Sequence, residues 1–460
     1  MGRIFSDIWS GARRAWDPRG NDESNQLNRT KRVQATALAA IGTKVVALLT
    51  AIVSIRLTLP YLGAERYGMW MTVVSAAAML SFSDLGMSST VTTFIASASG
   101  GERDRMAQTY VSSAFVLLLS TAIVLIACFF LAYPFVPWAS LFNVHSSKAV
   151  AEAGPTTAIF FLGTILCVPF SIVGRVQLGL QEGYKLHIWT AVGSLTTLIG
   201  VAFCARFATA LGPFVMVSVF CPLLAMVCNG LSYFTKVEPQ LRPRFSLFRL
   251  DVARQIAASG GIFLLQQVLS AFIYGVDGLI IVRVLGPAAV AEYSVAQRLF
   301  AMALLSQFLS LPLWPAFGDA FARGDKAWLL SSIPRSIALN VGMNFAVGIV
   351  LSVSGKDILR FWTAGAIVPG IALLIAFAFR AGQQGFDETL SAMLNHEPTM
   401  ARHMVYYGAA AVASLFLKIV MCYQWGSPGV VWAGTLAFAL FHALPSTNLV
   451  RKRLRTCSSL

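Results

Sequence analysis

Apolar runs of about 20 residues recur along the chain, and each is long enough to cross the core of a lipid bilayer as an α-helix. Charged residues make up only 12% of the chain, whereas a soluble domain carries roughly 25%. Backbone groups inside a bilayer must hydrogen-bond to one another, so we expect these runs to be helical. The sequence therefore predicts an all-α polytopic membrane protein.

Twelve spans can be counted, and the alternating pattern of a membrane β-barrel is absent. An even number of spans predicts that both termini lie on the same side of the membrane. The predicted spans are 33–57, 67–97, 109–133, 155–178, 187–207, 210–234, 255–281, 289–317, 332–354, 362–394, 403–423 and 428–449.

Basic residues set the expected orientation. With a cytoplasmic N-terminus, 24 of the 35 Lys and Arg side chains fall in cytoplasmic segments and seven fall at external edges. This bias is the positive-inside pattern of inner-membrane proteins. It also accounts for the net charge of +15 through contact with anionic membrane lipid, so we expect no nucleic-acid partner.

Two stretches suggest an internal repeat. YLGAERYGMWMTV (61–73) and VLGPAAVAEYSVAQRL (284–299) both place Leu-Gly and a short turn before a Tyr that opens a span. We therefore expect two halves of six helices around a central path. The predicted divisions are an amphipathic cytoplasmic arm (1–32), two six-helix bundles (33–234 and 255–450), a basic linker (235–254) and a basic tail (451–460).

The same stretches, with SDLGMSSTV (83–91) and PLWPAFGDAFARGD (312–325), resemble the two repeats of Wzx-type lipid-linked oligosaccharide flippases. These belong to the superfamily that includes the MATE multidrug exporters. The resemblance implies a V-shaped pair of six-helix bundles around a central cavity. It also implies transfer of a polyprenyl-pyrophosphate-linked sugar across a bacterial inner membrane, for O-antigen or exopolysaccharide assembly alongside other assembly proteins.

Ionisable residues inside the predicted spans are the candidate site. A charge at mid-membrane costs roughly 2.5–3.5 kcal/mol on insertion scales, so each needs a partner or a water-filled cavity. Lys418, near the external end of its span, is expected to extend to the membrane surface. We predict cavity cations at Lys44, Arg298 and Arg380, acidic or coupling groups at Asp84, Asp277 and Asp387, and polar cavity groups at Gln266, Tyr274 and Gln384.

Two patterns support these choices. In the tenth span, Arg380, Gln384 and Asp387 share one helical face, and a long polar stripe on a spanning helix must face protein or water. Lys44 lies at the middle of the first span. It would face the cavity or pair with Asp84 as a structural ion pair, and the sequence leaves both roles open for Asp84.

Three classes of function remain to be weighed. Cations in the membrane layer suit an anionic lipid-linked cargo, which favours a flippase that works by alternating access. The acidic residues keep open a MATE-like exporter of drugs or small molecules, and H⁺ or Na⁺ as a counter-ion. An enzyme is disfavoured because the chain contains none of the GxxxxGK[ST], HExxH or DxD motifs, and we expect no cofactor and no metal.

Overall fold

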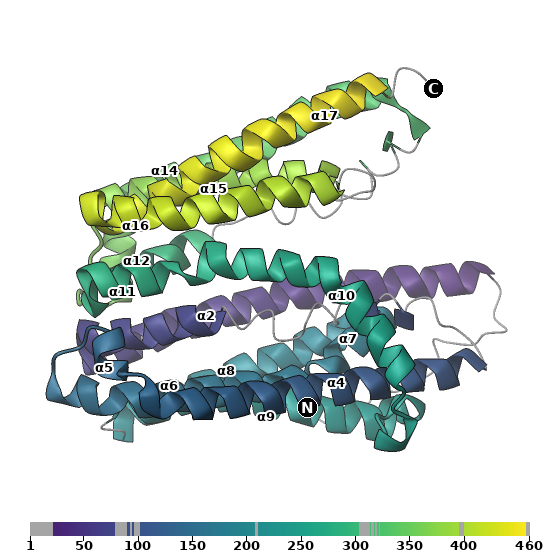
Figure 1. Ribbon diagram of the computed structural model, residues 1–460, viewed down its shortest axis with the longest axis horizontal. Helices are drawn as coiled ribbons and strands as arrows, with labels where there is room; N and C mark the ends of the chain where they lie inside the picture. The colour runs from purple at the N-terminus through teal and green to yellow at the C-terminus, as the bar shows by residue number, and fades with distance from the viewer. Residues whose placement is uncertain are drawn as a thin grey trace.

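The computed structural model of the protein is built from long helices (Figure 1). Eight helical segments within the described residues are long and apolar enough to cross a membrane. The structure describes residues 22–456 except for 79–89, 93, 96–101, 208–209, 303–312, 314–316, 318–319, 322 and 395–399.

Two of these eight segments contain a break. Helix α2 (Asp22–Ala78) is interrupted at Gly63, and α16 (Met400–Phe438) is interrupted at Gly426. Two further helices, α12 (Pro287–Met302) and α15 (Ile371–Leu394), overlap predicted spans. They are not among the eight segments because they are shorter or more polar than those segments. Each of the twelve predicted spans therefore overlaps a helix in the described part of the chain.

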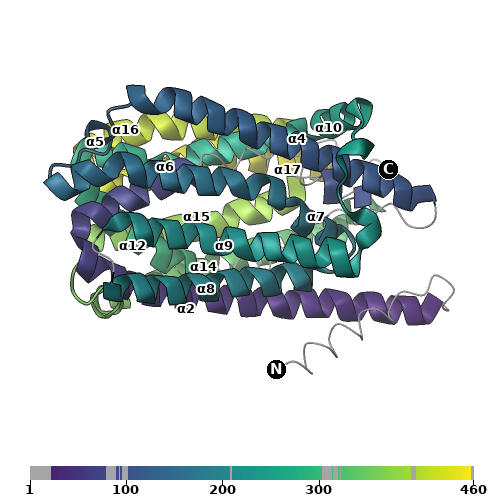
Figure 2. The ribbon, with the colours of Figure 1, turned by 90° about the horizontal axis from the view of Figure 1, so that it is seen from below.

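The helices form two bundles, which Figures 1 and 2 show from two directions. The first contains α2, α4 (Glu102–Ala132), α6 (Ser147–Phe170), α7 (Ile172–Gly179), α8 (Gly183–Phe207) and α9 (Leu211–Ser232). The second contains α10 (Leu250–Ser270), α11 (Asp277–Leu285), α12, α14 (Lys326–Trp362), α15, α16 and α17 (Leu444–Thr456).

The two bundles meet at the end of the molecule that holds α5 (Trp138–Leu141) and α11 (Figure 1). Here the Trp362 indole donates to the Ile52 carbonyl at 2.8 Å. Gly68 approaches the start of α12 so closely that an added Cβ would lie 1.7 Å from the Pro287 carbonyl oxygen. One hydrophobic core joins residues of both bundles around these contacts.

The predicted repeat is visible in the backbone. Gly63 has φ 73° and ψ 170°, and Gly286 has φ 89° and ψ 173°. Only glycine adopts such angles without strain, so the Leu-Gly turn is the same in both halves. Each turn is followed by a buried tyrosine, Tyr67 or Tyr293.

The linker packs against α4, and one span boundary differs from the prediction. The linker lies along the start of α4, where backbone N–H groups of Arg244 and Arg249 donate to the hydroxyls of Ser112 and Ser113. The tenth span was predicted from residue 362, but α15 begins at Ile371. Helix α14 ends at Trp362 because the next residues turn through positive φ at 364 and 365.

Candidate functional site

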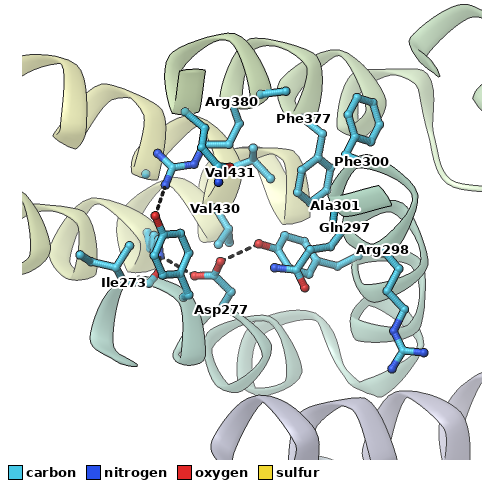
Figure 3. A pocket seen from close by; sticks show the side chains of 16 residues that line it. Ile273, Asp277, Gln297, Arg298, Phe300, Ala301, Phe377, Arg380, Val430 and Val431 are labelled. Carbon is cyan, nitrogen blue, oxygen red and sulfur yellow. Dashed lines mark hydrogen bonds and ion pairs between the residues drawn. The ribbon is translucent and has the colours of Figure 1, made fainter. Parts of the chain in front are cut away.

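A cavity of about 310 Å³ lies inside the second bundle (Figure 3). It is bounded by α11, α12, α15, α16 and the π-helical turn η6 (Ala271–Gly275) between α10 and α11. π-Helical turns often mark functional sites. Its charged and polar lining residues are Tyr274, Asp277, Tyr293, Gln297, Arg298, Arg380, Gln384 and Lys418.

An ion pair closes one side of the cavity. Lys418 Nζ lies 2.5 Å from Asp277 Oδ1, and Tyr293 donates its hydroxyl to Asp277 Oδ2 at 2.6 Å. Lys418 also donates to the Ile273 carbonyl, and its side chain is only 3% exposed. The expectation that Lys418 reaches the membrane surface is therefore wrong, because a carboxylate on α11 holds it inside the bundle.

Arg380 lines the same cavity and contacts two aromatic rings. Its guanidinium carbon is 4.9 Å from the centre of the Phe438 ring and 5.7 Å from that of Tyr274. One nitrogen donates to Gln383 Oε1 at 3.2 Å and another to the Tyr274 hydroxyl at 3.5 Å. These are neutral partners, and cation–π contacts leave the charge of an arginine in place.

Arg298 lines the same cavity, but its guanidinium points away from Arg380, toward α2 (Figure 3). There it contacts the Met71 sulfur at 3.1 Å, across the boundary between the bundles. Two of the three predicted cations, Arg298 and Arg380, thus line one cavity, and their guanidinium groups point in different directions. Arg298 therefore lies at a contact between the two bundles.

The polar stripe on α15 continues from Arg380 toward the end of that helix. Gln384 lines the cavity and donates to Glu388 Oε1 at 3.2 Å. Asp387 Oδ1 lies 3.2 Å from Nδ1 of His442, which is in the π-helical turn η7 (Ala439–Ala443). Sequence reasoning missed His442, because nothing local to residue 442 indicates that a carboxylate on another helix faces it.

Of the predicted polar residues, Tyr274 contacts Arg380, and Gln266 is half-buried on α10 outside the cavity lining. Asp84 lies outside the described residues, so its predicted partnership with Lys44 stays a prediction. Among the described residues, no group of three or more His, Cys, Asp or Glu side chains is placed to hold a metal ion.

Lys44 belongs to the first bundle, on α2. The threonines around it face α8, because Thr43 donates to the His187 carbonyl at 2.8 Å and Thr50 to the Ser194 carbonyl at 3.4 Å. The polar stripe of this span therefore holds two helices together, as interhelical hydrogen bonds do in membranes.

Lys44 itself lies on a third face of α2. At about 100° per residue it is roughly 100° from the threonine face and roughly 120° from the exposed apolar face. It is exposed, and it lies neither against α8 nor on the apolar side of the helix. The exposed apolar face comprises Leu38, Ile41, Val45, Leu49 and Val53.

The sequence matches a known protein family. The family model described as "Polysaccharide biosynthesis protein" matches residues 30–321, which is more than half of the chain. The chain belongs to this family. It is similar to a Yersinia pseudotuberculosis protein named for O-antigen export, with 21% identity over 294 residues, or 62% of this chain and 65% of that one.

The chain also has the fold of solved transporters. It matches an inward-facing MATE-family multidrug transporter with a TM-score of 0.72 and 16% identity, over 92% of this chain and 99% of that one. It matches the lipid II flippase MurJ with a TM-score of 0.67 and 13% identity, over 92% and 89%. These matches confirm the predicted all-α, MATE-like architecture.

Proposed function

We propose that the protein is a flippase that moves a polyprenyl-pyrophosphate-linked oligosaccharide from the inner to the outer leaflet of a bacterial inner membrane. The observation that carries the proposal is the membrane cavity lined by both Arg298 and Arg380. A pyrophosphate group is multiply anionic and loses its hydration when it enters the membrane. Guanidinium groups replace that hydration with paired, charge-assisted hydrogen bonds.

The pairing of the acidic residues supports an anionic cargo over a cationic drug. Asp277 is in contact with Lys418, and Asp387 is in contact with His442. Carboxylates with internal partners offer little to a drug cation, whereas the described hydrogen-bond and ring partners of Arg380 are uncharged. The MATE-like exporter is therefore the weaker alternative.

In the first bundle, Lys44 is a further cation that would suit an anionic cargo. Its face of α2 is neither the apolar exposed face nor the face that packs on α8. We place this lysine on the path of the pyrophosphate between the bundles 33–234 and 255–450. An anion could then pass from a cation on one bundle to cations on the other.

Alternating access fits the contacts between the bundles. Residues 52–71 of α2 contact α12 and the end of α14, and Tyr110 on α4 donates a hydrogen bond to Gln255 on α10. Breaking the contacts of α2 with the second bundle while forming others would expose the cavity to the other leaflet. The termini are cytoplasmic in this scheme, and other polysaccharide-assembly proteins supply and consume the cargo.

The test is a deletion strain complemented with variants. Loss of the protein should leave lipid-linked sugar on the inner leaflet, and wild-type protein should restore export. Arg380→Ala should fail to restore it at normal membrane levels. Arg206→Ala, which removes an exposed arginine at the end of α8, is the matched control and should restore it. Restored drug efflux without any change in lipid-linked sugar would overturn the proposal.

A further inference from the structure

The linker between the two bundles (235–254) exposes large apolar and basic side chains on the same segment. Phe245 is 68% exposed, Phe248 38% and Leu250 56%. The exposed basic residues of the linker are Lys236, Arg242, Arg244, Arg249 and Arg254. Exposed apolar side chains beside basic ones mark a surface that binds a membrane or another protein.

Contacts with α4 hold the linker in place. The linker lies beside the first turns of α4, where α10 also begins (Figure 1). The Gln108 amide donates to the Arg242 carbonyl at 3.0 Å, and the Phe245 ring packs edge-on against Phe115 with centroids 6.2 Å apart. With the two serine contacts described above, these interactions fix the linker against residues 108–115.

The length of α4 shows where the linker lies relative to the bilayer. The apolar segment that contains α4 runs from Arg105 to Phe135, which is 31 residues or about 46 Å at helical rise. The hydrocarbon core is about 30 Å thick, so a bilayer centred on this segment leaves about five residues at each end in the head-group layer. The hydrocarbon then begins near residue 110, within the stretch that contacts the linker. The linker therefore lies at the boundary between head groups and hydrocarbon.

This surface carries an excess of positive charge. The linker contains five basic and two acidic residues. One of the acidic residues, Asp251, is bound to Arg249 at 2.9 Å. Among the residues that the structure describes, no carboxylate forms an ion pair with Arg242, Arg244 or Arg254. These three exposed guanidinium groups can bind phosphate oxygens through paired hydrogen bonds.

We propose that linker residues 242–254 form a binding surface for the anionic head groups of phospholipids. The three arginines without a carboxylate partner bind the phosphate oxygens, and the exposed apolar side chains of the same segment enter the edge of the hydrocarbon. A soluble polyanion fits less well, because it would leave those apolar side chains in water. This surface is separate from the cavity in the second bundle and does not depend on which cargo the protein carries.

Photo-crosslinking identifies what covers this surface. Leu250 is replaced by the photoreactive p-benzoylphenylalanine in the full-length protein, and membranes of the producing cells are irradiated before mass spectrometry. A phospholipid adduct is the expected product, because Leu250 is 56% exposed at the level of the acyl chains. An adduct with another protein in place of a phospholipid adduct overturns the proposal.

The need for charge is measured with defined lipids. The full-length protein in detergent is titrated with phosphatidylglycerol or phosphatidylcholine, and native mass spectrometry counts the bound lipids. Each arginine near an anionic lipid surface contributes about a fivefold preference. The combined variant Arg242→Gln, Arg244→Gln and Arg254→Gln should therefore weaken binding of at least one phosphatidylglycerol at least about tenfold, with little change for phosphatidylcholine. Any lipid bound in the cavity is common to both proteins and cancels in this comparison.

A matched variant separates this surface from other basic residues. Arg335→Gln, Arg451→Gln and Lys452→Gln together remove the same charge from exposed positions outside the linker, and this protein should bind phosphatidylglycerol at the linker like the wild type. Equal phosphatidylglycerol binding by the wild type and the linker variant overturns the proposal. Displacement of the lipid by an equal concentration of inorganic phosphate overturns the assignment to a lipid and indicates a site for free anions.

Discussion

Replacing Lys418 with methionine tests whether the buried ion pair organises the cavity. Lys418 and Asp277 are 2.5 Å apart, and their side chains are 3% and 11% exposed. Methionine keeps the length of the side chain and removes the charge. Breaking a buried pair by removing one partner costs about 3–5 kcal/mol, because the remaining charge is left without compensation.

The double variant supplies the reference. Lys418→Met with Asp277→Asn removes both charges of the pair, and the introduced amide can still accept the hydrogen bond that Tyr293 now donates to the aspartate. The Ile273 carbonyl loses its Lys418 donor in both proteins, so this loss cancels between them. The double variant should therefore be more stable than Lys418→Met by about 3–5 kcal/mol, the cost of the uncompensated charge.

The assay is unfolding of the purified protein in mixed detergent micelles, with each variant compared as a four-member cycle. If the two single changes simply add in the double variant, the ion pair does not stabilise the bundle and the reasoning is refuted. A Lys418→Met protein as stable as the wild type would refute it as well.

Four further predictions concern export, stability and topology. Arg380→Lys should keep part of the export activity if the positive charge alone is needed, and little if the guanidinium must bind two phosphate oxygens at once. Accumulation of lipid-linked sugar on the inner leaflet measures the remaining activity. Gly68→Ala should cost about 1–3 kcal/mol of stability through overpacking against α12, measured by thermal unfolding. Reporters fused after residues 240 and 455 should read cytoplasmic and one near 145 external. Changing Lys44 and Asp84 together should impair export less than either change alone if they pair, and additive losses would contradict pairing.

Local features could be predicted from the sequence because their physical causes are local. Hydropathy summed over about 20 residues identifies a span without knowledge of its neighbours. The Leu-Gly turns at Gly63 and Gly286 were predictable because both repeats need the same positive-φ backbone, which favours glycine. Where turn chemistry competes with hydropathy the prediction was wrong, as at the start of α15, nine residues after the predicted residue 362.

Side-chain partnerships between helices were decided by the tertiary structure. Lys418 is 141 residues from Asp277, and no pattern around either residue indicates that they meet. The contacts of His442 with His403 and Asp387 join η7 to α16 and α15. A charge inside a membrane predicts that a partner exists, because isolation is costly. Which residue becomes that partner depends on how the helices pack.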